Sequence, residues 1–383
     1  MISLTFARQM IIAVNTRFLL AGYLEGYGYF IHECFKRITH DHPEHQFIFI
    51  FDRPFDPRFV YEKNVTPVVI GPPARHPVLW KWWYDVKIPQ VLKKYKADIF
   101  VSADGFCSLT TSVPQCLVIH DLAYLHHPAF IKKSHLIFYK IYTPRFLKKA
   151  DSIATVSAFT KADIHQRYKI DNEKISVVYN AAKSSFKPLT EDLKFNVKLK
   201  YTDGKEFFLY SGAIHPRKNL LNLLKGFSVF KKRLKSNFKL VIAGRLAWKY
   251  ESFLKDLETY KYRHDVVLTG YLPEEELVSL TASAYALVYP SLLEGFGVPV
   301  LEAMQSGVPV ITSARSAMEE IAGDAALYAD VTTPFDIGEK MMNLYKDESQ
   351  RDMLIQKGLQ KAGEYSWQKT SALLWQSICN SKP

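Results

Sequence analysis

Short hydrophobic runs alternate with helical patterns along the whole chain. In the first half the runs occupy residues 11–14, 47–51, 68–70, 99–102, 115–120 and 152–156. In the second half they occupy residues 206–210, 238–243, 265–269, 286–289, 309–312 and 326–328. Runs of this length between amphipathic segments are typical of buried parallel strands joined by helices. The pattern predicts an α/β protein built on parallel sheets.

The two series of strands are separated by a polar stretch at residues 182–205, which lacks periodicity and is interpreted as a linker. We therefore expect two tandem, doubly wound, Rossmann-like domains. Residues 1–190 form the first, residues 191–365 form the second, and residues 366–383 form a final segment. In sheets of this kind ligands bind beyond the carboxyl ends of the strands. Residues just after the strands are therefore the candidate ligand-binding residues.

Composition fits a soluble globular chain, with 48% hydrophobic and 23% charged residues among 383. No apolar run approaches the roughly 20 residues of a membrane-spanning helix. The four cysteines show neither metal-binding spacing nor a disulfide framework, which favours reduced thiols and a cytoplasmic location. The N-terminus lacks the features of a signal peptide, and residues 1–9 are interpreted either as a loose extension or as sequence before a true start at Met10.

The net charge of +12 is concentrated in the first half, where residues 1–190 hold 25 Lys and Arg against 15 Asp and Glu. This asymmetry favours an acidic partner, such as an anionic membrane surface or a phosphate-bearing acceptor; the alternative is a solvated basic surface with no partner. Aromatic residues and lysines mix at residues 80–84 and 93–96, as in interfacial helices. Alternatively, Trp80 and Trp83 pack into the core. No recognised module supports nucleic-acid binding.

The segment at residues 291–307 carries most of the chemistry. Glu294 and Glu302 lie on either side of a glycine-bracketed turn between two strands, with Pro299 suited to a first helical turn and Gly307 to the position just past the helix. Glycines let the backbone approach a ligand, and a helix start offers N–H groups to an anion. The segment therefore predicts a phosphate site.

Ionised carboxylates only accept hydrogen bonds and would repel a diphosphate, so Glu294 and Glu302 are expected to face hydroxyl groups flanking it. A nucleotide sugar has hydroxyl groups on both sides of its diphosphate, those of the ribose and those of the carried sugar, so the segment predicts a nucleotide-sugar site. The alternative is that Glu302 is an exposed helix residue and Glu294 a solvated loop residue.

Three further motifs follow predicted strands. The glycine loop at residues 22–32 contains Gly26 and Gly28 but lacks the third glycine of a dinucleotide fingerprint. His120 could donate to a sugar hydroxyl or move a proton, the alternative being a local hydrogen bond. Arg217 and Lys218 provide fixed positive charge for a leaving diphosphate, the alternative being an exposed basic helix end. Since the chain has no Asp-x-Asp triplet, we expect these cations rather than a metal to neutralise the diphosphate.

Together these motifs resemble the retaining glycosyltransferases of family 4, which have the GT-B fold, over roughly residues 10–375. The resemblance implies two Rossmann-like domains facing a cleft. The second binds a nucleotide diphosphate sugar as co-substrate, without a further cofactor, and the first binds a glycan or lipid-linked acceptor. It also implies a C-terminal helix that crosses back to the first domain.

By the same resemblance, Glu294 contacts the transferred sugar and Glu302 holds the ribose hydroxyls. Lys218 and Arg217 neutralise the diphosphate, and His120 touches the donor sugar. The remaining donor-binding positions implied by the resemblance are Gly28, Gly212, Tyr271, Leu272, Phe296, Gly297 and Val298, with the base meeting backbone groups of Tyr271 and Leu272.

One position departs from the family pattern. Many members have an arginine just after the glycine that ends the first strand of the second domain, and here that residue is Ala213. Arg245, at the end of the next strand, is a candidate replacement.

The activity implied is a metal-independent, retaining transfer of a hexose, mannosyl or glucosyl, in the synthesis of a surface polysaccharide or glycolipid. The protein would be cytoplasmic or peripheral on the inner face of the membrane. In the implied mechanism the acceptor hydroxyl attacks from the face that the diphosphate leaves, and a phosphate oxygen takes the proton. The alternatives are a nucleotide-sugar epimerase of the same architecture and a non-catalytic nucleotide-sugar-binding protein, the latter encouraged by Ala213.

Overall fold

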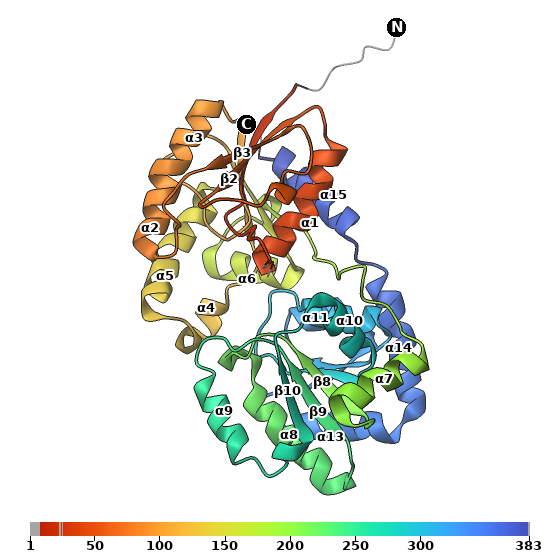
Figure 1. The fold of residues 1–383 in the computed structure, drawn as a ribbon. Helices are drawn as coiled ribbons and strands as arrows, with labels where there is room; N and C mark the ends of the chain where they lie inside the picture. Colours follow the sequence, from red (N-terminus) through yellow and green to blue (C-terminus); the bar gives the residue numbers. More distant parts are fainter. Residues whose placement is uncertain (1–7, 23, 25, 382–383) are drawn as a thin grey trace. The chain divides into compact units, whose positions relative to one another are not determined.

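The computed structural model describes residues 8–22, 24 and 26–381, so the question of a start at Met10 falls largely on residues outside the described ones. The chain forms two compact units (Figure 1). The first comprises Met1–Asn180 and Trp367–Pro383, and the second Ala181–Ser366. The division differs from the expected one at residue 190 because residues 181–190 are tied to the second unit. Gln305 donates hydrogen bonds of 2.8 Å to the carbonyls of Lys183 and Phe186.

The first unit contains a seven-stranded parallel sheet in the order β3-β2-β1-β4-β5-β6-β7. Its strands are β1 (Ile11–Asn15), β2 (Gln46–Phe51), β3 (Val65–Val69), β4 (Ile99–Ser102), β5 (Gln115–Ile119), β6 (Ser152–Thr155) and β7 (Ile175–Val177). The six predicted strands are confirmed. The sequence reading missed β7, which is three residues long and only partly buried. The strand order reverses between β1 and β4.

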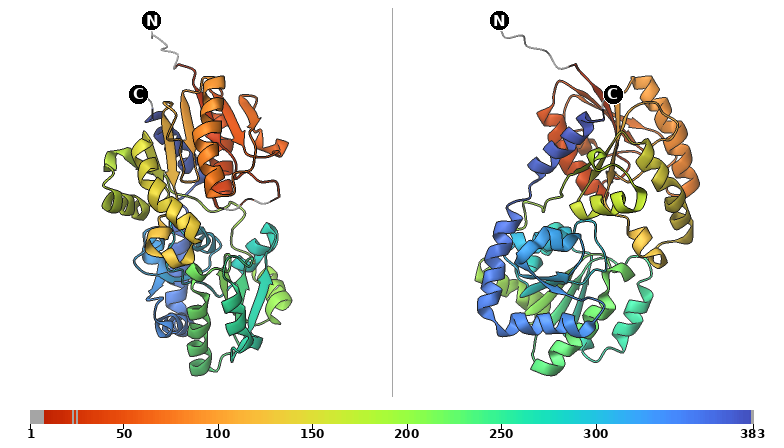
Figure 2. Two further views of the ribbon diagram at one scale, coloured as in Figure 1. Left: turned by 90° about the vertical axis from the view of Figure 1, so that its left-hand side faces the viewer. Right: turned by 180° about the vertical axis from the view of Figure 1, so that it is seen from behind.

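Helices cover both faces of this sheet (Figure 2). The larger ones are α1 (Gly26–Asp41), α2 (Pro77–Trp82), α3 (Ile88–Tyr95), α5 (Lys133–Lys149), α6 (Ala158–Tyr168) and α15 (Trp367–Cys379), with a π-helical segment η2 (Trp83–Lys87) between α2 and α3. The C-terminal helix α15 packs against α1 and β6, which confirms that the end of the chain returns to the first unit.

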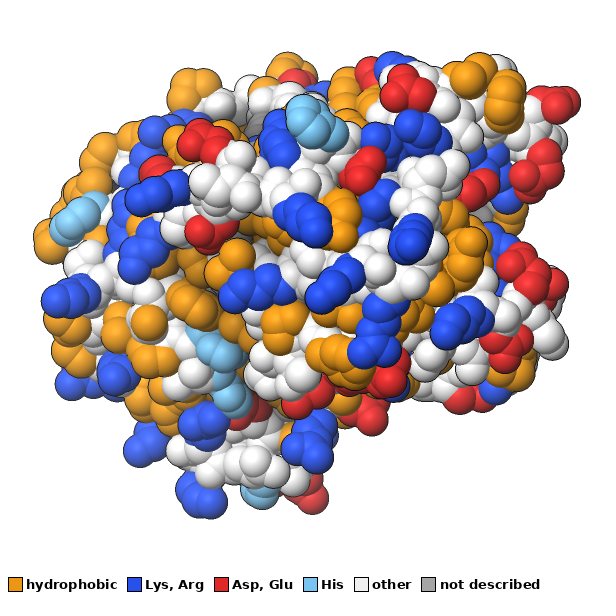
Figure 3. Space-filling model, turned by 90° about the horizontal axis from the view of Figure 1, so that it is seen from below, with side chains coloured by type: hydrophobic (Ala, Val, Ile, Leu, Met, Phe, Trp, Pro, Cys, Tyr) orange, Lys and Arg blue, Asp and Glu red, His pale blue; other side chains and the backbone are white. Residues whose placement is uncertain are grey.

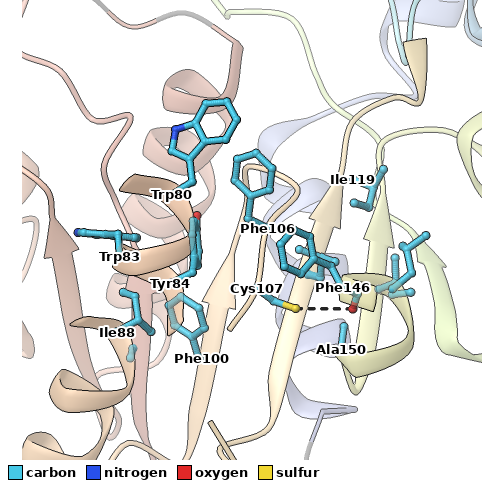
Figure 4. Packing of buried hydrophobic residues seen from close by; sticks show 14 of the residues in the cluster. Trp80, Trp83, Tyr84, Ile88, Phe100, Phe106, Cys107, Ile119, Phe146 and Ala150 are labelled. Atoms are coloured by element: carbon cyan, nitrogen blue, oxygen red, sulfur yellow. Dashed lines mark hydrogen bonds between the residues drawn. The ribbon is translucent and has the colours of Figure 1, made fainter. Parts of the chain in front are cut away.

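The core of the first unit contains Trp80 and Trp83, two tryptophans of the segment that the sequence analysis considered as a membrane-interface helix. Trp80 and Trp83 are buried among aromatic and aliphatic side chains that include Phe106 and Phe146 (Figure 4). Their indole N–H groups donate to backbone carbonyls at 2.8 and 3.0 Å. These two residues therefore pack the core, as the alternative interpretation held. Trp82, between them, is 36% exposed.

The second unit contains a six-stranded parallel sheet in the order β10-β9-β8-β11-β12-β13. Its strands are β8 (Phe207–Ser211), β9 (Lys239–Ala243), β10 (Val266–Gly270), β11 (Ala286–Tyr289), β12 (Val310–Ser313) and β13 (Ala326–Ala329), all at the predicted places. The order reverses between β8 and β11. Loops that follow these two strands leave in opposite directions and frame the ligand position of doubly wound folds.

The linker prediction for residues 182–205 is wrong in its second part, because helix α7 spans Glu191–Thr202. Its leucine and phenylalanine side chains are half exposed, so no apolar stripe marks it in the sequence. The remaining large helices of this unit are α8 (Leu220–Leu234), α9 (Glu251–Glu258), α10 (Glu274–Ala282), α11 (Val298–Gln305), α12 (Ala317–Ala322), α13 (Pro334–Lys346) and α14 (Glu348–Ala362). Helix α13 packs on α8, and α14 on α11.

Candidate functional site

The loops after β8 and β11 bring three predicted site residues together. After β8, a single 3-10 turn (Pro216–Lys218) presents Arg217 and Lys218. After β11, the loop before α11 presents Glu294. The two loops are joined because the Arg217 carbonyl accepts a 2.9 Å hydrogen bond from the amide of Leu292. The cations and the carboxylate are thus held at the switch point of the second sheet.

Glu294 is paired with both cations. Lys218 Nζ lies 2.5 Å from Glu294 Oε1, and Arg217 Nη1 lies 3.1 Å from Oε2. The hydroxyls of Ser291 and Tyr289 also donate to Oε1, at 2.5 and 3.3 Å. Burial by itself would raise the pKa of Glu294, but Arg217 and Lys218 lower it to about 2. The carboxylate is therefore ionised at neutral pH, and this three-residue charge cluster carries a net charge of +1.

The sequence analysis assigned Arg217 and Lys218 to a diphosphate and Glu294 to a sugar. In the structure the two cations contact Glu294 itself. Tyr289 and Ser291 were missed by sequence reasoning. Lys218 Nζ also lies 2.6 Å from Tyr289 Oη, so this tyrosine orients both charges. A signal was present, because Tyr289 ends a buried strand and Ser291 follows it directly.

Glu302 lies on α11 in a different environment. It is 8% exposed, as is Glu294, so the readings of an exposed helix residue and a solvated loop residue are both wrong. Among the residues that the structure describes, none donates a hydrogen bond to its carboxylate. Burial raises the pKa of Glu302 to about 7, although the charge of Lys183 opposes the shift. A buried carboxylate without donors is costly, and ligand hydroxyls would satisfy it.

The start of α11 matches the predicted turn. Gly297 caps the helix with φ of 97°, Pro299 lies in the first turn, and Gly307 follows the end. A β-carbon on Gly297 would come within 2.7 Å of the Met318 side chain, so glycine is required here for conformation and for space. The amide groups at Gly297 and Val298 belong to the helix start, which has no intrahelical acceptor for them.

The other predicted donor-site residues of this unit are placed as follows. Phe296 is buried and its ring contacts the ring of Tyr365, so only its backbone can meet a ligand. The amide of Gly212 donates to the Ala243 carbonyl at 2.9 Å, which extends the β8–β9 pairing and occupies that donor. The carbonyl of Ala213, the residue that departs from the expected family pattern, accepts a 3.1 Å bond from Tyr210.

Tyr271 and Leu272 follow β10, which lies two strands from β8 in the sheet. Tyr271 is 61% exposed. Both residues directly precede α10, and α10 contacts the helix that carries Glu302. Glu274, the first residue of α10, is near enough to Glu302 for its charge to influence the pKa of that carboxyl.

In the first unit, His120 follows β5, and its Nε2 lies 3.1 Å from the carbonyl of Ala103. Because a carbonyl only accepts, Nε2 carries the proton and is used in a local hydrogen bond, while the role expected for His120 toward a sugar stays a prediction. Burial lowers the pKa of His120 to about 4, so the ring is neutral at pH 7.

Gly28 lies in the first turn of α1, where a β-carbon would come within 2.3 Å of the Phe18 carbonyl. That glycine is required for packing.

Sequence reasoning missed a second group of residues, at the switch point of the first sheet. Asn15 ends β1 and Arg17 comes just after it, while Ser102 ends β4 and Asp104 comes just after it. Tyr84 reaches them from η2. All five are buried and joined by hydrogen bonds. Polar residues at the ends of two buried strands were a signal, but their convergence depends on β1 and β4 being neighbours, which the sequence does not reveal.

Two features of the described residues bear on metals and membranes. Within the described part of the chain, no three His, Cys, Asp or Glu side chains gather to form a metal-binding group. Over the same residues, none of the helices is long and apolar enough to traverse a bilayer. Figure 3 shows one face, on which Lys and Arg side chains are interspersed with acidic and hydrophobic ones rather than forming one continuous patch.

Comparisons with known proteins cover both units. The family described as "Glycosyl transferases group 1" matches residues 192–361, and "Glycosyltransferase Family 4" matches residues 39–185. O-antigen chain mannosyltransferase B of Escherichia coli is 30% identical over 250 residues, which are 65% of this chain and 66% of that protein. O-antigen chain mannosyltransferase RfbU of Salmonella typhimurium is 32% identical over 233 residues, 58% of this chain and 60% of that protein. Both matches thus span less than two thirds of the relative.

A solved structure extends the comparison to nearly the whole chain. Anabaena HepE, determined in complex with UDP-glucose, superimposes with a TM-score of 0.74 at 13% identity, covering 97% of this chain and 100% of that one. At this identity the likeness shows the fold, which is the two-domain Rossmann-like GT-B fold. That the two domains of this chain face each other across a cleft stays a prediction.

Proposed function

The chain belongs to the group 1 glycosyltransferases of family 4, and on this premise we propose that it transfers a mannosyl residue from a nucleotide diphosphate sugar to a glycan or lipid-linked acceptor. The names of the two bacterial relatives support mannose as the sugar and a surface polysaccharide as the product. The observation that carries the proposal is the charge cluster of Arg217, Lys218 and Glu294 at the switch point of the second sheet.

The proposed donor lies along the carboxyl edge of the second sheet. Its diphosphate meets Arg217, Lys218 and the start of α11, because fixed cations and helix amides are the groups that bind phosphate. Its ribose hydroxyls donate to Glu302, which has no other donor among the described residues. Its base reaches Tyr271 and Leu272, two strands away, which at the spacing of neighbouring strands is about 10 Å. That separation suits a nucleotide in an extended conformation.

Glu294 has a double role in this proposal. Before the donor binds, it neutralises Arg217 and Lys218. When the diphosphate takes over the cations, the carboxylate, held by Ser291 and Tyr289, stabilises positive charge that develops on the sugar ring. An ion exchange of this kind keeps the partly buried cations paired at each stage, which avoids the cost of an unpaired charge in a partly buried position.

The transfer itself is proposed to retain configuration. The bond from the anomeric carbon to the diphosphate oxygen breaks while a bond to the acceptor oxygen forms on the same face. The acceptor proton passes to the departing phosphate oxygen, so the step needs neither an enzyme nucleophile nor a separate base. Hydrolysis or transfer followed by NMR of the anomeric product would test this, and an inverted product would overturn it.

Charge neutralisation by Arg217 and Lys218 leads us to propose that no divalent ion is required. Initial transfer rates measured with and without EDTA are expected to agree within about twofold. If chelation abolished activity and Mg²⁺ or Mn²⁺ restored it, the proposed role of the two cations would be insufficient.

A panel of nucleotide sugars tests the proposed donor. Uridine and guanosine diphosphate derivatives of mannose, glucose and galactose would be added to the full chain, because a ligand that binds only the folded state raises the melting temperature. We expect one mannosyl nucleotide to give the largest shift, and Lys218→Ala to reduce it. Glu258→Ala, at an exposed position of α9, is the control. A panel without any shift would contradict the proposal, and sugar epimerised without acceptor would identify an epimerase.

We also propose that the first unit docks on an anionic membrane surface. Helix α5 carries five Lys and Arg residues and no Asp or Glu. Helices α2 and α5 contact each other, and apolar side chains are exposed on both and on η2. These side chains are Val78, Trp82, Val86, Ile137 and Ile141, which we call the apolar face. Exposed apolar residues beside lysines are the composition of interfacial surfaces.

Co-sedimentation with vesicles containing phosphatidylglycerol tests this docking. Binding is expected to fall with salt and to weaken in the double variant Trp82→Gln/Ile137→Ser, because both the electrostatic and the apolar contributions are needed. Leu193→Gln removes a similarly exposed apolar residue from the second unit and serves as the control. Equal binding by all three proteins, or none at low salt, would contradict the proposal.

A further inference from the structure

The second unit has a pocket at the amino edge of its sheet, which is the end of the strands opposite to the proposed donor site. Its volume is about 460 Å³. Glu206 and Tyr285 directly precede the neighbouring strands β8 and β11, and Ser306 and Gly307 lie between α11 and β12. Helices α7 and α14 supply most of the other lining residues, and we call this space the amino-edge pocket. It is separate from the charge cluster, which lies in the loops after β8 and β11.

Three ion pairs line the amino-edge pocket. They are Lys194–Glu191 at 2.9 Å, Lys198–Glu206 at 2.6 Å and Arg351–Glu348 at 2.9 Å. In each pair the cation is less exposed than the carboxylate. Asp352 is a further, exposed carboxylate, so the lining carries four negative and three positive charges. The pocket therefore presents hydrogen-bond donors and acceptors side by side, with a net charge of only −1.

Two buried polar atoms of the lining residues, Ser306 Oγ and Arg351 Nε, have no hydrogen-bond partner among the residues that the structure describes. Ser306 is 1% exposed. The guanidinium carbon of Arg351 lies 4.5 Å from the ring centroid of Tyr285, so this stacking and the bond to Glu348 fix its orientation. A buried donor without an acceptor costs free energy, and an oxygen atom of a ligand or of water would remove that cost.

The charges of the pocket decide which ligand suits it. An anion would meet four carboxylates, a cation would meet three less exposed cations, and an apolar group would leave Ser306 and Arg351 unpaired. A hydroxyl group both donates and accepts, so neighbouring hydroxyls of one sugar ring can donate to a carboxylate and accept from its paired cation. The volume lies within the range of roughly 300–1,000 Å³ that is typical of sites for small organic ligands. A neutral saccharide matches all of these features.

We propose that the amino-edge pocket binds a neutral saccharide at a second site, apart from the donor site. This deepens the proposed function and rests on it for the identity of the saccharide, which is a mannose-containing segment of the glycan being lengthened. A second contact with the same glycan raises its effective concentration at the enzyme between transfers. Long glycans gain from this contact, whereas an acceptor too short to occupy both sites at once does not.

The first test needs no donor and follows Arg351 by NMR of the full chain labelled with ¹⁵N in its arginines. The Nε–H signal of Arg351 is identified by its loss in Arg351→Lys, and mannotriose is expected to shift this signal in a saturable way. Arg233 is the internal control, because its guanidinium also lies over an aromatic ring, that of Phe335 at 5.0 Å, but outside the pocket. A shift with inorganic phosphate but not with mannotriose would indicate an anion site, and an unmoved signal would indicate a pocket filled by water. Either result would overturn the proposal.

A second test removes the hydroxyl that has no partner. Ser306→Ala loses no hydrogen bond to the described residues, so its melting temperature should not fall, while its affinity for mannotriose should weaken about fivefold. Ser279→Ala, whose hydroxyl donates to a carbonyl within its own helix α10, is the control and should keep the full affinity. Equal affinity of Ser306→Ala and the unchanged protein, by isothermal titration, would contradict the proposal.

Kinetics then connect the pocket with transfer. Arg351→Gln is expected to raise the KM of a long mannan acceptor about fivefold and to leave the KM of a monosaccharide acceptor and of the donor unchanged. Lys357→Gln removes a paired cation from the same helix outside the pocket and is the matched control. If Arg351→Gln does not fold, Ser306→Ala replaces it. An equal rise for long and short acceptors would overturn the proposal. Absence of transfer with every donor would refute the proposed function, whereas the NMR and titration results would still decide whether the pocket binds a saccharide.

Discussion

The two glutamates of the 291–307 segment are equally buried but have opposite electrostatic surroundings. Two cations and two hydroxyls stabilise the charge of Glu294, so its pKa falls to about 2. Nothing comparable surrounds Glu302, and burial raises its pKa to about 7. The spacing of the pair predicted a shared site, but not this difference. The difference between the two pKa values arises because Arg217 and Lys218, in the turn after the neighbouring strand β8, reach Glu294. Glu302 lies on helix α11, away from both cations.

The raised pKa of Glu302 implies a cost to stability that depends on pH. Its folded pKa of about 7 exceeds the ordinary glutamate value of 4.5, so the penalty is absent below pH 4.5 and is complete above pH 7. Glu302→Gln is therefore expected to increase the free energy of unfolding at pH 8, by up to about 3 kcal/mol, and to change it little at pH 4. Urea unfolding at both pH values measures this. A variant that is less stable than the unchanged protein at pH 8 would contradict it.

The same carboxylate should control donor binding. Ribose hydroxyls bind an ionised carboxylate more strongly than a protonated one, so the donor KM is expected to rise as pH falls from 8 to 6. Glu302→Gln should have a high donor KM at both pH values, because its amide does not titrate. Initial rates over a range of donor concentrations at each pH check this. A KM that varies with pH in Glu302→Gln as it does in the unchanged protein would assign the titration to another group.

At the scale of elements, the sequence predicted what hydrophobicity alone determines. Twelve of the strands were found because they are short apolar runs, most of them buried, although β3 and β10 are partly exposed. Helix α11 was found because a glycine, a proline and a second glycine mark its ends. Helix α7 was missed because it is largely exposed, although Thr190 and the acidic residues of its first turn are helix-start signals. The group of buried polar residues around Asp104 was missed because its members meet only through the strand order.

Helix α1 offers a test of close packing at the element scale. A β-carbon at Gly28 would lie 2.3 Å from the Phe18 carbonyl, a backbone atom that cannot move without its loop. Gly28→Ala is therefore expected to displace the start of α1 and to destabilise the protein by roughly 1–3 kcal/mol. Gly71→Ala, where a β-carbon meets nothing within 4 Å, is the matched control for thermal unfolding. Equal melting temperatures for the two variants would show that the loop adapts at no cost.

At the scale of the whole molecule, the chain builds two units with separate cores and returns its last helix to the first. Leu374 and Ile378 of α15 are completely buried, and Ser152 of β6 donates a 2.7 Å bond to the Ser377 carbonyl. Removing residues 367–383 is expected to expose the α1 and β6 surfaces and to unfold the first unit selectively. Hydrogen exchange should then rise across β1–β7 but not across β8–β13. Equal protection of both units would contradict this division.

The central claim is that the charge cluster of Arg217, Lys218 and Glu294 binds the donor diphosphate and that Glu294 acts on the sugar. Glu294→Gln separates these roles, because it removes the charge that neutralises the two cations. The variant is expected to bind the nucleoside diphosphate as tightly as the unchanged protein or more tightly, by isothermal titration. Its rate of sugar transfer should fall at least about 100-fold, while Glu258→Gln changes neither quantity. Transfer at an unchanged rate by Glu294→Gln, or a parallel loss of nucleotide binding and transfer, would contradict the account.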